Sequence, residues 1–140
     1  MRVGLVNSGG NPKPPAWIEL PKIMPPYGTD EFKRTTTTLY IRKEFVGDYN
    51  FESVVCATAH EMSHIVLEAT GHPLRDNEKV VDLTAMLCGF AELYVRGITY
   101  RDFQESRSYK LGYLTIAEAE HAASLMRGIR EQHRHAQSCW

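Results

Sequence analysis

The spacing of apolar residues predicts two successive helices in the middle of the chain. Apolar residues recur at helical intervals from 51 to about 70, between Asn50, a good N-cap, and Gly71, which suits a helix end. A second helix is expected from 76 or 77 to about 95. Its apolar residues surround the helix widely, and this pattern predicts deep burial.

A third helix and one strand are expected on either side of this pair. Residues 115–135 should be helical, because Thr115 and Glu118 form a capping box at the start of the segment. Residues 35–45 (TTTTLYIRKEF) are rich in β-branched and aromatic residues and alternate in polarity. This alternation predicts a strand with one buried face and one wet face, of the kind found at a sheet edge.

The N-terminal part is rich in proline. Six of the seven prolines fall between positions 12 and 26, which predicts an extended and largely irregular arm over residues 1–30. Within it, the apolar pieces at 3–6 and 17–20 are candidate strands. We therefore expect one helix-dominated α+β domain composed of the arm (1–30), a core (35–95) and a C-terminal helix (115–135).

Composition and charge exclude several classes of protein. The 140 residues suit a single hydrophobic core. The net charge is −1 and lysine and arginine form no long cluster, so the chain lacks the signature of a nucleic-acid binder. No window approaches the roughly 20 apolar residues that a membrane-spanning helix needs. We expect the chain to bind neither nucleic acid nor membranes.

The cysteines and the N-terminus indicate a compartment. The first residues lack the apolar stretch and cleavage site of a signal peptide. The cysteines are three in number and widely spaced (Cys56, Cys88 and Cys139), which argues against a disulfide framework. A cytoplasmic protein is the expectation.

The residues most suited to chemistry are the sequence His60-Glu61-Met62-Ser63-His64, an H-E-x-x-H pattern. Residues four apart lie on one face of a helix, so His60 and His64 can bind one zinc ion together. Glu61 is rotated about 100° from His60 and is poorly placed as a ligand. It is instead placed to take a proton from a zinc-bound water.

A catalytic zinc site generally needs a third protein ligand. The downstream candidates are His72, Asp76, Glu78 and Asp82. Glu78 is the most suitable, because it begins the second helix and can reach a zinc ion held by an antiparallel neighbour. Asp82 follows one turn later and can accept the free ring N–H of a ligand histidine.

These residues resemble the gluzincin zinc metallopeptidases, and the short spacing between His64 and Glu78 is similar to that of the compact minigluzincins. The resemblance covers residues 39–94. It implies a zincin-like fold, in which a small antiparallel N-terminal sheet packs on the H-E-x-x-H helix. It also implies the zinc ligands His60, His64 and Glu78, with Glu61 as general base and Asp82 supporting a histidine.

The resemblance further implies a peptide or protein substrate that pairs with an edge strand, here residues 37–41. Family members also use a histidine or tyrosine to stabilise the oxyanion, and the candidates here are His121, Tyr109 and Tyr113. His121 is the working choice.

The function expected from the sequence is therefore that of a zinc metallopeptidase that hydrolyses a peptide bond. The alternative is a zinc-binding regulatory or interaction module without turnover. Two features would favour the alternative: a site closed by Cys56 as a fourth ligand, or a cleft covered by Trp17 and the proline-rich arm.

Overall fold

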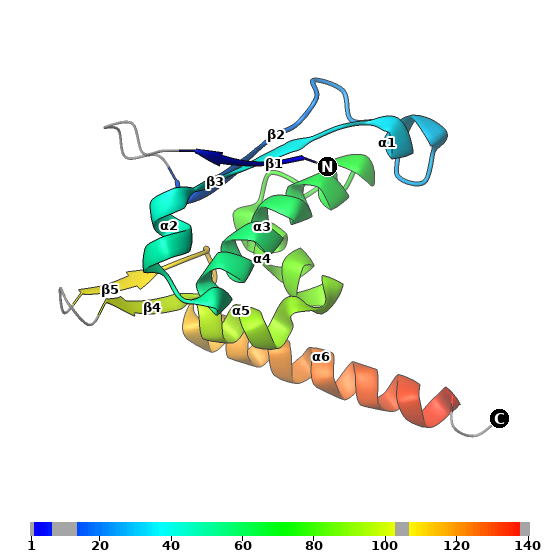
Figure 1. Cartoon of the computed structure of the whole chain (residues 1–140). Helices are drawn as coiled ribbons and strands as arrows, with labels where there is room; N and C mark the ends of the chain where they lie inside the picture. Colours follow the sequence, from blue (N-terminus) through cyan, green and yellow to red (C-terminus); the bar gives the residue numbers. More distant parts are fainter. Residues whose placement is uncertain (1, 7–13, 103–106, 138–140) are drawn as a thin grey trace.

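The protein is dominated by helices, with a small sheet at one end (Figure 1). The computed structural model describes residues 2–6, 14–102 and 107–137. Its helices are α1 (Asp30–Arg34), α2 (Lys43–Asp48), α3 (Phe51–Ala69), α4 (Glu78–Ala85), η1 (Met86–Phe90), α5 (Ala91–Gly97) and α6 (Ile116–Gln137). The expected class, a helix-dominated α+β fold, is confirmed. Among the described residues, no helix is both long enough and apolar enough to span a membrane.

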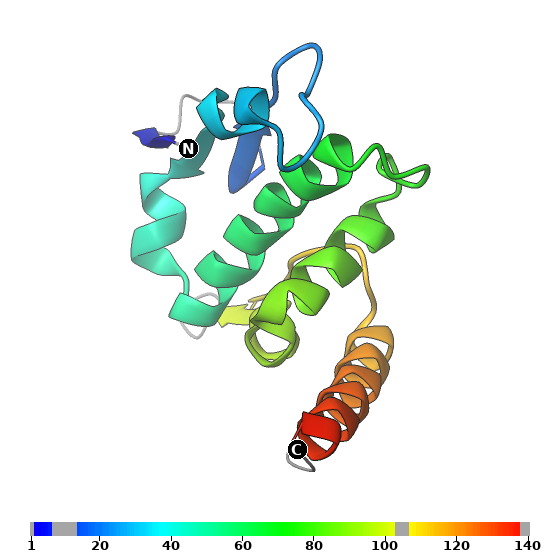
Figure 2. The same cartoon turned by 90° about the vertical axis from the view of Figure 1, so that its right-hand side faces the viewer.

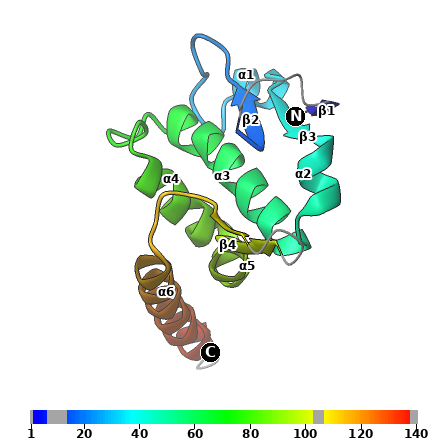
Figure 3. The ribbon, with the colours of Figure 1, turned by 90° about the vertical axis from the view of Figure 1, so that its left-hand side faces the viewer.

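Helix α3 is the centre of the fold. It lies between the sheet on one side and the pair α4 and α5 on the other (Figure 3). Helix α6 packs on α5 and extends away from the sheet, so the sheet and the end of α6 lie at opposite ends of the molecule (Figure 2).

The sheet contains β1 (Arg2–Val6), β2 (Ala16–Glu19) and β3 (Thr38–Arg42) in the order β1-β3-β2. Strand β1 pairs with β3 in parallel and β2 pairs with it antiparallel. The sheet is therefore mixed, and the expectation of an antiparallel sheet is wrong. The expected edge strand at 35–45 is also wrong, because β3 is the central strand and ends where α2 begins. Both of its neighbours come from the proline-rich segment, which is less irregular than expected.

The two faces of β3 have different surroundings. Leu39 and Ile41 are buried with Ala16 and Phe45 in a small core that packs against α3. Tyr40 points to the opposite face, where its ring stacks on Trp17 at a centroid distance of 5.2 Å. The Trp17 side chain belongs to the outer face of the sheet, so the idea that it covers the cleft is wrong.

The main core lies where α3, α4, α5 and α6 meet. Gly97 lets the end of α5 touch the first turns of α3, because a Cβ there would overlap the Glu52 carbonyl and lie 2.9 Å from the Cβ of Cys56. Ser53 adds a buried hydrogen bond from its hydroxyl to the Gly97 carbonyl at 3.0 Å. These contacts hold α5 directly against α3 and fix the orientation of both.

The helix expected from 77 to 95 is broken. The backbone forms the π-helical turn η1, in which Gly89 has a φ of 113°. Glycine tolerates this angle because it has no Cβ, and the chain changes direction between α4 and α5. Leu87 beside the break is 64% exposed, contrary to the expected burial. The hairpin of β4 (Thr99–Asp102) and β5 (Arg107–Lys110) was not predicted.

Candidate metal centre

Helix α3 carries both histidines of the H-E-x-x-H sequence. The Asn50 side chain caps this helix by accepting a hydrogen bond from the Ser53 N–H at 2.8 Å. The helix then continues without a break to Ala69, as the pattern requires. The side chains of His60 and His64 are 12% and 23% exposed and face the start of α4. Helical spacing therefore brings the two imidazoles together at a partly buried position.

Glu78 in the first turn of α4 completes a group of three candidate ligands. Its Oε2 atom lies 3.2 Å from His60 Nε2 and 3.6 Å from His64 Nε2. One ligand atom from each of the three residues lies within 4.8 Å of the others. Ligands bound tetrahedrally to zinc at about 2.0–2.1 Å are separated by roughly 3.3 Å. The two separations from Glu78 bracket this value, so this group of three could hold one small cation.

One oxygen of the Glu78 carboxylate lies at ion-pair distance from both imidazoles but accepts no hydrogen bond from them. This Oε2 atom is buried and accepts no hydrogen bond within the described part of the chain. A buried polar atom without a partner is costly, by about 1–3 kcal/mol and more for a charged group. A cation shared with the two imidazoles would satisfy this oxygen.

Asp82, one turn further along α4, fixes the orientation of His60. Its side chain is fully buried, and its Oδ1 lies 2.6 Å from His60 Nδ1. Its Oδ2 accepts hydrogen bonds from the backbone N–H groups of Tyr113 at 2.6 Å and Leu114 at 2.9 Å. An ionised carboxylate can only accept hydrogen bonds, so the ring proton of His60 must be on Nδ1. The lone pair of His60 Nε2 is then left for a metal.

The same contacts determine the charge of Asp82. Burial by itself would raise the pKa of Asp82. The hydrogen bond with His60, the neighbouring Tyr94 hydroxyl and the hydrogen bonds from the two backbone N–H groups outweigh burial, and the pKa lies below the usual value. Asp82 is therefore a carboxylate at neutral pH.

A close-packed shell surrounds this carboxylate. The Tyr94 hydroxyl on α5 lies beside the Asp82 carboxylate. The backbone of Gly112, with a φ of 77°, packs closely against both groups. A Cβ at Gly112 would overlap the Tyr94 hydroxyl and lie 3.1 Å from Asp82 Oδ2. Neither Tyr94 nor Gly112 was predicted to belong to the site. No spacing rule connects them to the H-E-x-x-H sequence, and only the fold brings them together.

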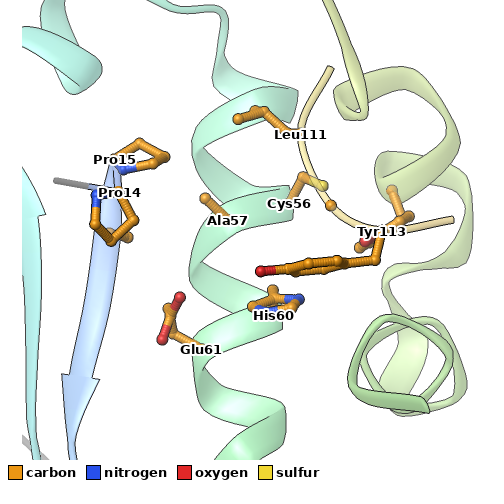
Figure 4. Close-up of a pocket in the computed structure, with 11 residues that line it drawn as sticks. Pro14, Pro15, Cys56, Ala57, His60, Glu61, Leu111 and Tyr113 are labelled. Carbon is orange, nitrogen blue, oxygen red and sulfur yellow. The ribbon is translucent and has the colours of Figure 1, made fainter. Parts of the chain in front are cut away.

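Glu61 lies outside the group of three and faces the sheet. Its carboxylate accepts a hydrogen bond from the backbone N–H of Ile18 in β2. Burial raises the pKa of Glu61, and the nearby Glu78 charge adds to the increase, against the opposing effects of His60 and the Ile18 N–H. Figure 4 shows Glu61 between α3 and β2, while His60 points toward the other side of the helix.

The remaining candidates lie in different places. Cys56 is buried one turn before His60 and is not part of the metal-binding group found among the described residues. Burial raises the pKa of the Cys56 thiol to about 12, so the thiol is neutral at pH 7. Tyr113 lies over His60, with stacked rings 5.7 Å apart. His121 is exposed on α6, and the side chain of Tyr109 lies outside the described residues.

Comparison with known proteins finds no matching family model, no similar curated protein and no similar solved structure. Any function must therefore be argued from the chemistry of this site.

Proposed function

We propose that the chain is a cytoplasmic zinc metallopeptidase of gluzincin type. His60, His64 and Glu78 would hold the zinc ion, with Asp82 holding His60 in the correct tautomer. The observation that carries the proposal is the convergence of one ligand atom each from His60, His64 and Glu78, where the buried Oε2 atom of Glu78 accepts no hydrogen bond among the described residues. Two imidazoles and one carboxylate are the ligand set of a catalytic zinc site, which keeps a further position open.

The chemistry supplied by zinc would be that of a Lewis acid, which polarises a carbonyl and lowers the pKa of water toward about 7. Glu61 is adjacent to the ligands but does not belong to them. It would take the proton of the attacking water and pass it to the leaving amine. The Ile18 N–H orients this carboxylate and keeps it on the side of α3 that faces β2.

The free edge of β2 is the place where a peptide would bind by main-chain pairing. The edge expected at 37–41 is not available, because β3 is paired on both sides. In β2 the Ile18 N–H points away from β3 and toward Glu61. Because backbone groups alternate along a strand, those of Ala16 point the same way. An extended peptide on this edge would pass the carboxylate of Glu61.

Tyr113 would stabilise the negative charge that develops on the substrate carbonyl. Its ring lies over His60, and its hydroxyl points across α3 toward the side on which Glu61 lies (Figure 4). Burial and the charges of Glu78, Asp82 and Glu61 raise its pKa, so the hydroxyl keeps its proton for donation. His121 does not line the cavity beside His60 and Glu61, and Tyr113 does.

The test measures zinc content and peptide hydrolysis in the same preparations. We expect about one zinc per chain in the wild type and loss of zinc in Glu78→Ala. Glu61→Gln should keep its zinc and lose hydrolysis of a peptide library by about 10²–10⁴-fold. Glu120→Gln, at an exposed position of α6, is the matched control and should change neither quantity. Wild-type hydrolysis by Glu61→Gln would refute the role of this residue, and a zinc-free wild type would refute the site.

A further inference from the structure

The chain between β5 and α6 passes alongside α4, next to the metal centre (Figure 3). Asp82 holds the middle of this segment, because its Oδ2 accepts hydrogen bonds from the backbone N–H groups of Tyr113 and Leu114. The next backbone N–H, that of Thr115, donates to the Glu118 carboxylate at 2.7 Å. Three successive amides therefore donate to carboxylates, and the segment connects Asp82 to Glu118.

Glu118 is also tied to the helix that carries Glu78 and Asp82. Its Oε1 atom accepts a hydrogen bond from Lys79 Nζ at 2.6 Å, while its Oε2 atom accepts the one from Thr115. Lys79 follows Glu78 in the first turn of α4, and Asp82 lies three residues further on. On a helix, residues three apart are neighbours. Helix α4 thus holds the same segment at two points, through Asp82 and through the Lys79–Glu118 ion pair.

The upstream end of the segment is fixed separately. The Leu111 N–H donates to the Ile98 carbonyl at 2.8 Å. Between this contact and the ion pair lies the Tyr113 ring, which stacks over His60. The two amides that donate to Asp82 lie there as well. The ion pair is therefore the downstream anchor of the contacts that orient His60.

The contribution of this anchor is small. The side chains of Lys79 and Glu118 are 51% and 43% exposed. Exposed ion pairs change an equilibrium constant by at most about fivefold. Leu114 is buried in the main core, so packing supports the segment as well. Loss of the ion pair should therefore loosen the segment without displacing it.

We propose that Lys79 and Glu118 are positioning residues of the metal centre, which hold residues 113–115 against Asp82 and so keep Asp82 in place to orient His60. The inference rests on the proposed zinc site, because its functional consequence is a higher zinc affinity. Neither residue belongs to the group of three candidate ligands, so both act only through the contacts of Asp82.

The test removes the ion pair and keeps the cap of α6. Glutamine serves in a capping box as glutamate does, so Glu118→Gln keeps the acceptor for the Thr115 N–H and loses the charge that pairs with Lys79. Lys79→Gln removes the other charge. Glu92→Gln is the matched control, because the Glu92–Arg127 pair also joins α6 to another helix. Its atoms are likewise 2.6 Å apart, and its side chains are 51% and 56% exposed.

Two quantities are measured in each variant. Hydrogen exchange of the Tyr113 and Leu114 amides is followed by NMR in the metal-free protein, and zinc affinity is measured by competition with a chelator. Glu118→Gln and Lys79→Gln should each speed exchange at both amides and weaken zinc binding by about two- to fivefold. The double variant should lose no more than either single one, because the two charges form one interaction. Glu92→Gln should change neither quantity.

These measurements separate a positioning role from a contribution to overall stability. Equal changes in Glu92→Gln and Glu118→Gln would assign the effect to overall stability and overturn the proposal. Unchanged zinc affinity in the Lys79 and Glu118 variants, or additive losses in the double variant, would also overturn it. A wild type that binds no zinc would refute the proposed function. The exchange rates of the metal-free proteins would then decide alone whether the ion pair holds the segment against Asp82.

Discussion

Replacing Asp82 with asparagine changes one atom of a fully buried group and should reverse the tautomer of His60. Oδ2 of Asp82 accepts two backbone N–H groups, those of Tyr113 at 2.6 Å and Leu114 at 2.9 Å. The amide oxygen of the variant must take this position, because an amide nitrogen there would face two donors. The amide nitrogen is then left beside His60 Nδ1, 2.6 Å away in the wild type.

An N–H donor at that position requires Nδ1 of His60 to be an acceptor. The ring proton then moves to Nε2, which points at Glu78 and at the proposed zinc ion. Loss of a partner that orients a ligand histidine typically costs 10–100-fold in metal affinity, about 1.4–2.7 kcal/mol. In the metal-free protein, a hydrogen bond to a charged group is replaced by a neutral one, and we expect unfolding to become easier by about 1–3 kcal/mol.

Zinc affinity is measured by competition with a chelator at neutral pH, and stability by urea unfolding of the metal-free protein. Asp30→Asn is the control, because Asp30 is 77% exposed and forms a surface ion pair with Lys33. Unchanged zinc affinity in Asp82→Asn would refute the tautomer argument. An equal loss in both variants would show that carboxylate charge in general, rather than this contact, controls metal binding.

Two other predictions concern the segments around the site. Gly112→Ala should destabilise the protein by several kcal/mol in urea unfolding, because a Cβ would overlap the Tyr94 hydroxyl in a backbone conformation with positive φ. Gly71→Ala, also at positive φ but with open space around it, should cost only about 1–2 kcal/mol, and equal losses would contradict the packing argument. Glu118 has a pKa lowered to about 2, mainly by its hydrogen bond from Lys79. Its stabilising contribution is present above the unfolded value of 4.5 and is lost as the pH falls toward 2. The stability difference between wild type and Glu118→Gln, measured from pH 6 to pH 3, should therefore shrink as the pH falls, and a constant difference would refute it.

Local signals in the sequence were sufficient for the helices that carry the candidate ligands. Asn50 caps α3, and the Thr115–Glu118 capping box forms at the start of α6, with the Thr115 N–H donating to Glu118 at 2.7 Å. Both signals depend on residues close in sequence, so no tertiary information is needed. The proximity of His60, His64 and Glu78 was also expected from helix geometry and a short connection.

Features that depend on distant contacts were not predictable in this way. The alternation of apolar and polar residues in β3 predicts one buried face. It carries no information about whether both edges of the strand are paired. The two partner strands were expected as candidates at 3–6 and 17–20, but no local signal indicates that they lie on either side of β3. The break at Gly89 was missed because a single glycine is tolerated within a helical pattern. The backbone groups that hold Asp82 carry no side-chain signal, so the support of His60 was visible only as an aspartate one turn after Glu78.

The hydrogen bonds to Asp82 also have a consequence for biosynthesis. The N–H groups that hold its carboxylate belong to residues 31 and 32 positions further along the chain. While the chain is being synthesised, His60, His64, Glu78 and Asp82 leave the ribosome well before Tyr113 and Leu114. The nascent protein thus passes through a stage that has every candidate ligand but lacks the contacts that orient His60. At the proposed zinc site, tight metal uptake should therefore begin only after the segment around residue 113 has docked, when the fold is nearly complete.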